Sequence, residues 1–260
     1  MGAALTDDEW KALIANAVAA RSIPLKMFTY RNKSWPSWSK PVVLAAENGT
    51  EFVVKSPRIG VPQSRAIVTE QIVSILGMAI GAPVGEVFTV EVPKALVDIN
   101  PVALGAIGPG VCHGSKRIAN TSERAMLAHV DLPANRTRFA AIAVLYGWMP
   151  AADHQLIYDL SSPFHVHSVD HGFFFAGGPN WTEATLGAAA AAACDTTIVN
   201  GCKLSSDELR ATLERVRDVR PEVLANAVAR PPDEWGISPA ERLAVAKYLA
   251  ARQATLSALI

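Results

Sequence analysis

The stretch PVVLAAENGTEFVVKSP, residues 41–57, constrains the fold more than any other part of the chain. Two runs rich in β-branched residues flank Asn48-Gly49, the pair that two-residue hairpin turns favour. The second run ends at Lys55, so a basic side chain lies at the end of the second predicted strand. A two-residue turn predicts this cross-strand register: Val43 opposite Val54, and Leu44 opposite Val53.

The segments around this hairpin predict two helices and another strand. TDDEWKALIANAVAA reads as a helix with Thr6 as its N-cap and acidic residues in its first turn. SRAIVTEQIVSILGMAIGAPV reads as a second helix, with Ser64 as its cap and Gly81 and Pro83 as its stop. GEVFTVEVP then predicts a strand. Residues 1–100 therefore read as helix, hairpin, helix and strand.

The remainder of the chain is predominantly helical by pattern. Residues 100–122 are rich in glycine and predict a loop. From Ser122 onward helices dominate, interrupted by one hairpin formed by QLIYDL and HVHSVD. Two capped helices close the chain, in SSDELRATLERVRDV and SPAERLAVAKYLAARQATLSALI. The fold class predicted is α+β.

Composition excludes several classes of protein. Lys plus Arg and Asp plus Glu are 24 each, so a general nucleic-acid or membrane-surface binder, which needs a basic excess, is not expected. Three cysteines without a C-x-x-C pair predict free thiols in a reducing compartment. The apolar run FAAIAVLYGWM is shorter than the roughly 20 residues of a membrane span. Because the N-terminus also lacks a signal-peptide pattern, we expect a cytoplasmic protein with no membrane partner.

The run HVHSVDHGFFF places an ionisable Asp170 at the end of a strand that is otherwise apolar. A buried carboxylate is costly unless a cation meets it. The cation could be a metal ion, a basic side chain or a helix end. Asp170 therefore predicts a functional or paired site at this turn.

Four ionisable residues stand out by position: Lys55, Glu70, Asp153 and Asp170. A lysine and a glutamate lie on adjacent elements, and the two aspartates lie at either end of one hairpin. This set suits phosphoryl transfer, because the reaction needs a fixed cation on the phosphates, carboxylates for magnesium and a carboxylate that positions the attacking hydroxyl. The cation facing Asp170 would then be a nucleotide-bound Mg²⁺.

The order and spacing of several motifs resemble the HipA-like branch of the protein-kinase-like fold. EFVVKSP resembles the strand with the nucleotide lysine, and IVTEQIVSILGMAIGAPVGEVFTVEV the glutamate helix and the next strand. WMPAADHQLIYDL resembles the catalytic segment, and SVDHGFFF the metal-binding aspartate with its His-Gly turn. The closing RPPDEWG and YLAARQATL resemble the family's helical tail. The resemblance runs from about residue 40 through most of the chain.

The resemblance implies a two-lobed fold with ATP and Mg²⁺ between the lobes. Residues 1–100 would form a small β-rich N-lobe, and residues 101–260 a mainly helical C-lobe. It also implies residue roles. Lys55 would contact the phosphates with Glu70 holding it, Asp153 would orient the acceptor hydroxyl and accept its proton, and Asp170 would hold Mg²⁺. The base would lie against VFTVEV, through backbone groups near Glu91 and Val92.

One departure from the family leaves two functions open. The family has an asparagine metal ligand shortly after the catalytic aspartate, whereas this chain offers Gln155, whose longer stem fixes its carbonyl oxygen less well. The first function is an ATP-dependent kinase that transfers a phosphoryl group to a hydroxyl acceptor, either protein Ser/Thr or a small molecule. The second is a pseudokinase that binds nucleotide and acts as an interaction module.

Simpler interpretations apply to the same residues. A lysine at a strand end is commonly a solvated edge residue, and Glu70 lies opposite the strongest apolar stripe of its helix, as a surface glutamate would. However, compact residues flank Glu70 and would let another element approach its face closely, namely Ala66, Val73 and Gly77. A third function, a metal-dependent hydrolase, would use His165 and His167, which share a strand face, together with Asp170.

Overall fold

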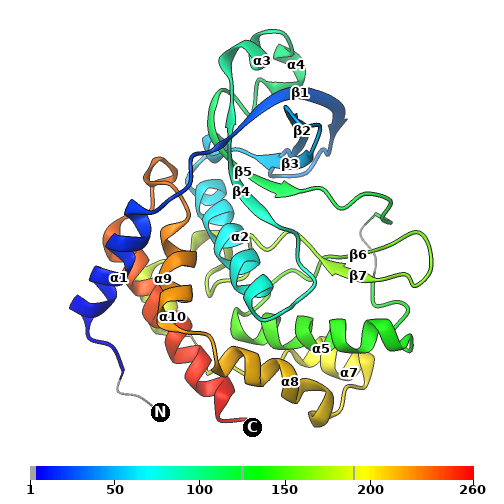
Figure 1. Cartoon of the computed structure of the whole chain (residues 1–260), viewed down its shortest axis with the longest axis vertical. Coiled ribbons are helices and arrows are strands. Elements are labelled where there is room, and N and C mark those ends of the chain that lie inside the picture. Colours follow the sequence, from blue (N-terminus) through cyan, green and yellow to red (C-terminus); the bar gives the residue numbers. More distant parts are fainter. Residues whose placement is uncertain (1–3, 124–125, 190) are drawn as a thin grey trace.

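The structure is a computed structural model of the chain and describes residues 4–123, 126–189 and 191–260. It is a mixed α+β structure with a small β-rich N-terminal region and a helical C-terminal part (Figure 1). The predicted fold class is confirmed at this level. Two hydrophobic cores correspond to the two parts: one lies inside the sheet, and the larger one lies among the helices.

The N-terminal sheet is a closed barrel with the strand order β1-β2-β3-β5-β4. Its antiparallel ladders are completed by a parallel pairing of β1 with β4. The side chains inside the barrel are apolar and buried, including Met27, Leu44, Phe52 and Val90. The strands have these bounds: β1 Leu25–Ser34, β2 Val42–Ala46, β3 Glu51–Lys55, β4 Val87–Val92 and β5 Gly110–Lys116.

The predicted hairpin is present as β2 and β3, but its predicted register is wrong by one residue. Val43 pairs with Val53, and Leu44 pairs with Phe52. The reason is the length of the turn: Ala46 N–H donates to Thr50 O at 2.9 Å, so three residues rather than two form the loop. Gly49, at φ +80°, takes the left-handed position that three-residue hairpin loops require.

The region expected as a loop, residues 100–122, contains α4 (Pro101–Leu104) and β5. Glycine is needed within β5, because a Cβ on Gly114 would lie 2.5 Å from Val90 Cγ1 of the neighbouring strand. Close packing therefore accounts for a glycine that pattern alone assigns to a loop.

β5 joins the barrel although it follows residue 100. The domain boundary predicted at residue 100 stays a prediction. β1 and α3 (Lys94–Asp98) were not predicted either.

Helix α2, Val61–Ala79, lies between the barrel and the helical part (Figure 1). It begins three residues before the predicted cap, and the Ser64 hydroxyl donates to Trp235 O instead of capping the helix. It ends as predicted, just before Gly81 at φ +73°. Both sides of α2 are packed, so nearly all of its residues between Ala66 and Gly77 are buried.

The helical part contains the predicted closing helices and the predicted second hairpin. The hairpin consists of β6 Leu156–Tyr158 and β7 Val166–Ser168, which pair antiparallel. The side chains of Thr6, Ser205 and Ser238 cap α1, α8 and α10. The helices have these bounds: α1 Asp7–Ala19, α5 Pro133–Trp148, α6 Glu183–Gly187, α7 Thr196–Cys202, α8 Ser206–Arg217, α9 Pro221–Ala229 and α10 Pro239–Ser257. Within the described residues, none of these helices combines the length and apolar character that crossing a membrane requires.

Candidate functional site

The structure brings Lys55, Glu70 and Asp170 together from three separate elements. Lys55 ends β3, Glu70 lies in the middle of α2, and Asp170 follows β7. The Lys55 Nζ lies 2.7 Å from Glu70 Oε2 and 2.7 Å from Asp170 Oδ1. One ammonium group therefore bridges two carboxylates that are a hundred positions apart along the chain.

Lys55 and Glu70 are both buried, at 5% exposure each, so the interpretations as edge lysine and surface glutamate are wrong. Their burial follows from the packing of α2 on two sides. On the side of the site, a Cβ on Gly172 would lie 3.1 Å from Ala66 Cβ. Further along α2, a Cβ on Gly77 would lie 3.0 Å from Val84. The small residues beside Glu70 admit close neighbours, as predicted.

Mutual attraction fixes the charge state of the buried pair. Burial by itself lowers the pKa of Lys55, but the carboxylates of Asp170 and Glu70 outweigh burial and raise the pKa above its ordinary value. Burial likewise favours the neutral form of Glu70, yet Lys55 and His113 lower the pKa of that carboxyl overall. The pair is an ammonium and a carboxylate throughout the neutral pH range.

A buried histidine extends this network away from the cavity. His113 of β5 is fully buried, and its Nδ1 lies 2.8 Å from Gln71 Oε1. Its Nε2 lies 3.6 Å from Glu70 Oε1, on the side of the carboxylate away from Lys55. The Glu70 carboxylate therefore accepts a hydrogen bond from Lys55 at one oxygen and has the imidazole of His113 near the other.

Asp170 adopts an unusual backbone conformation. Its φ is +58°, in the left-handed region, which aspartate tolerates better than most residues but which still costs free energy. The next residue, His171, anchors the turn: its Nε2 lies 2.8 Å from Ser168 Oγ, and its Nδ1 lies 3.1 Å from Ser74 Oγ of α2. Burial lowers the pKa of His171 to about 4, so this anchor is neutral at pH 7.

Gln155 connects the two aspartates. Its Nε2 donates to Asp153 Oδ2 at 2.7 Å and lies 3.3 Å from Asp170 Oδ2. All three side chains come from the hairpin region: Asp153 and Gln155 precede β6, and Asp170 follows β7. The antiparallel pairing of β6 with β7 places the two ends of this hairpin side by side.

A cavity of about 190 Å³, here called the Lys55 cavity, joins these groups. Five predicted site residues line it: Lys55, Glu70, Asp153, Gln155 and Asp170. Its volume is below the roughly 300–1,000 Å³ typical of pockets for drug-sized ligands. As it stands, the cavity has room for a phosphate-sized group and not for a whole nucleotide.

The sequence analysis missed several further residues of the Lys55 cavity, among them Trp38, Phe173 and Gln63. Trp38 lies in the loop between β1 and β2 and makes an edge-to-face contact with Phe173, with ring centroids 5.8 Å apart. Gln63, in the first turn of α2, is completely buried, and neither its Nε2 nor its Oε1 has a hydrogen-bond partner among the described residues. The connector NKSWPSWSKP, residues 32–41, is rich in tryptophan and was a usable signal for Trp38. A single glutamine in a helix carries no such signal.

The other two predicted site residues, Glu91 and Val92, do not reach the Lys55 cavity. Both lie in β4, where Glu91 pairs with Lys26 of β1 on one side and with Val111 of β5 on the other. Their backbone groups face neighbouring strands of the barrel. The predicted backbone contact with a nucleotide base therefore has no support from this arrangement.

The predicted metal site of His165, His167 and Asp170 does not assemble either. His165 Nδ1 lies 3.2 Å and His167 Nε2 lies 2.9 Å from the carboxylate of Asp159, not from Asp170. Within residues 4–123, 126–189 and 191–260, no group of three or more His, Cys, Asp or Glu side chains could hold a metal ion. The two histidines instead form a hydrogen-bonded cluster with one aspartate.

Comparison with known proteins agrees with the motifs. Residues 31–157 match a family model described as HipA-like kinase. The predicted family resemblance is confirmed by this match, which includes Lys55, Glu70, Asp153 and Gln155, while Asp170 lies beyond it. No curated protein matches the chain.

Proposed function

From the match of residues 31–157 to the HipA-like kinase family, we propose that this protein uses ATP and Mg²⁺ to phosphorylate a hydroxyl acceptor. The family supports a kinase-type function in general. The observation that carries the specific proposal is the meeting of the Lys55 ammonium with Glu70 and Asp170, in a cavity that Asp153 also lines. We further propose that the barrel and the helical part act as the two lobes of a kinase-like fold.

Lys55 would bind the phosphates of ATP. An ammonium group has three N–H donors, and two of them here point at Glu70 and Asp170. The third is then available for a phosphate oxygen, while Glu70 keeps the amine in place. Because the pKa of Lys55 is raised, the group is a permanent cation in the neutral range, as stabilisation of charge on phosphate oxygens requires.

The oxygen-bearing side chains beside Lys55 fit Mg²⁺, which is usually bound by one or two carboxylates together with substrate phosphates. Asp170 would hold the ion, and Gln155 would join it as the counterpart of the family's asparagine. The amide of Gln155 faces both carboxylates, and rotating it by half a turn would present its carbonyl oxygen in place of its NH₂. The ion, when bound, would neutralise charge on the phosphate oxygens.

Asp153 would position the acceptor. Its carboxylate lines the same cavity as Lys55 and is linked through Gln155 to Asp170. A carboxylate at this place can accept a hydrogen bond from a hydroxyl group and take its proton as the oxygen attacks phosphorus. Lys55 and Asp170 would act on the nucleotide, and Asp153 on the acceptor.

The Lys55 cavity must enlarge for a nucleotide to enter, because it measures only about 190 Å³. We propose that the loop that carries Trp38 moves to admit the nucleotide. This loop contacts the site through the packing of Trp38 on Phe173, and Trp38 is 47% exposed. Nucleotide binding would separate these two rings.

A thermal-shift measurement tests the proposal with the whole chain. ATP with Mg²⁺ is expected to raise the melting temperature, because a ligand that binds only the folded state stabilises it. ATP without Mg²⁺ should raise it less, and Asp170→Asn should remove the difference between the two conditions. No shift at millimolar ATP would contradict the proposal. Binding without transfer of phosphate to any protein or small-molecule hydroxyl would favour the pseudokinase.

A further inference from the structure

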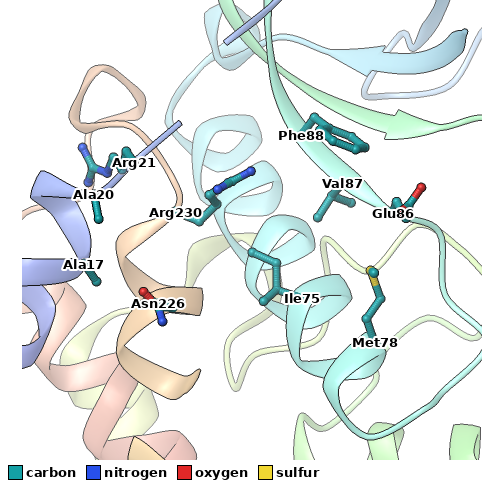
Figure 2. Close-up of a pocket in the computed structure, with 10 residues that line it drawn as sticks. All are labelled: Ala17, Ala20, Arg21, Ile75, Met78, Glu86, Val87, Phe88, Asn226 and Arg230. Carbon is teal, nitrogen blue, oxygen red and sulfur yellow. The ribbon is translucent and has the colours of Figure 1, made fainter. Parts of the chain in front are cut away.

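A second cavity, here called the Arg230 cavity, lies among α1, α2, β4 and α9 and measures about 370 Å³ (Figure 2). It shares no lining residue with the Lys55 cavity. Its apolar wall comes from α2 and β4, through Ile75, Met78, Val87 and Phe88. This volume falls in the range of roughly 300–1,000 Å³ that is typical of small-molecule sites.

Three charged side chains line the Arg230 cavity, and two of them already have partners. Glu86 forms an ion pair with Lys116, at 2.8 Å. Arg21 binds Asp233 at 3.1 Å and donates to Ala229 O at 2.5 Å. Their charges are thus compensated within the protein.

Arg230 differs from both. Arg230 is partly exposed, but its Nε is buried and has no hydrogen-bond partner among the described residues. Figure 2 shows its side chain extending from the end of α9 toward Phe88 of β4. A buried N–H without an acceptor is unfavourable, because it has lost its hydrogen bonds to water and gained none in the protein. An anion in the cavity would remove that cost.

We propose that the Arg230 cavity binds a small organic carboxylate with an apolar body. Arg230 would receive the carboxylate, since a guanidinium matches the planar geometry of that group and binds it through two parallel hydrogen bonds. Ile75, Met78 and Phe88 would cover the aliphatic or aromatic body. A neutral molecule of the same shape would leave Arg230 unpaired and would bind less well.

Titration calorimetry with octanoate and with octanamide tests this assignment, because the two probes share their chain and differ in charge. Both are measured without nucleotide, so the outcome is independent of the proposed kinase activity. We expect one octanoate site per chain and at least tenfold weaker binding of octanamide. Arg230→Met should weaken octanoate binding at least tenfold and leave octanamide binding nearly unchanged.

Two further variants complete the design. Met78→Asp, at a position that is 45% exposed and therefore tolerant of a polar side chain, should repel octanoate by placing a carboxylate in the cavity. Arg210→Met, which removes an exposed arginine that does not line the cavity, should change nothing. Equal affinity for the two probes, octanoate binding that survives both Arg230→Met and Met78→Asp, or no octanoate binding at all would overturn the proposal.

Discussion

Lys55 and Asp170 are separated by 115 positions in the chain, yet the lysine Nζ lies 2.7 Å from the aspartate Oδ1. Lys55 is buried, whereas the Asp170 side chain is 35% exposed on the cavity side. The contact therefore joins a largely buried cation that lines the cavity to a more exposed carboxylate of the same cavity. In the proposed kinase, ATP and Mg²⁺ would bind beside this contact: a phosphate oxygen would accept the third N–H of Lys55, and Mg²⁺ would meet Asp170.

Replacing Asp153 separates binding from transfer. Asp153→Asn keeps the shape of the side chain but removes its ability to accept a proton, so we expect phosphoryl transfer to fall about 10²–10⁴-fold while ATP binding persists. Transfer is measured with radiolabelled ATP. Asp159→Asn serves as the matched control, because Asp159 binds His165 and His167 outside the cavity. An unchanged rate in Asp153→Asn would remove this residue from the mechanism.

Replacing Glu70 tests the buried ion pair. Glu70→Gln leaves Lys55 with Asp170 alone, and breaking a buried pair typically lowers the free energy of unfolding by about 3–5 kcal/mol. The retained contact with Asp170 should keep the loss near the lower end. The same change in the exposed pair, Glu86→Gln next to Lys116, should cost less than about 1 kcal/mol. Urea denaturation compares them, and equal losses would show that burial adds nothing.

Replacing Gln63 should have opposite effects on stability and on binding. Gln63→Met removes a buried amide that has no partner, so the free energy of unfolding should rise by about 1–3 kcal/mol. ATP binding should weaken, because the amide lines the Lys55 cavity. Gln253→Met is the control: its Nε2 donates to Val216 O and Val219 O at 2.7 Å each, so that variant should be destabilised. A destabilised Gln63→Met with normal ATP binding would contradict this assignment.

Because His171 is buried, we expect the free energy of unfolding to fall in mild acid. Burial lowers the pKa of His171 from 6.5 to about 4 in the folded protein. Between these values the unfolded chain takes up a proton that the folded protein does not, so stability falls as the pH drops, by roughly 3 kcal/mol in total. Glu70, whose pKa is also lowered, contributes to this loss only below about its ordinary value of 4.5.

The variant His171→Gln provides the comparison for this acid effect. Urea denaturation of the two proteins between pH 7 and pH 4.5 should give a shallower dependence for the variant. Identical slopes would show that His171 is protonated in the folded protein as readily as in the unfolded chain. His167, whose pKa is lowered mainly by burial, leaves a residual slope of the same sign in both proteins.

Local pattern was sufficient for the elements whose signals are local. Hydrophilic caps and apolar periodicity predicted α1, α8 and α10, and β-branched runs predicted β2, β3, β4 and the β6–β7 hairpin. The residue types and their order singled out four ionisable side chains, Lys55, Glu70, Asp153 and Asp170, and the structure places all four around one cavity. The register of the β2–β3 hairpin failed by one residue, since Asn48-Gly49 fits both two-residue and three-residue loops.

Only the tertiary structure decided which side chains are buried and what they contact. The periodicity of α2 marks Glu70 as a surface residue, because it reports one apolar face and cannot show that the barrel covers another. Likewise, the sequence shows neither that β5 packs Gly114 against Val90 nor that the Gln63 amide and the Arg230 Nε lie buried without hydrogen-bond partners among the described residues. The sequence by itself determined the local helices and strands and the types of side chain that the site contains. The three-dimensional packing determined its geometry, because burial depends on contacts between segments that are remote along the chain.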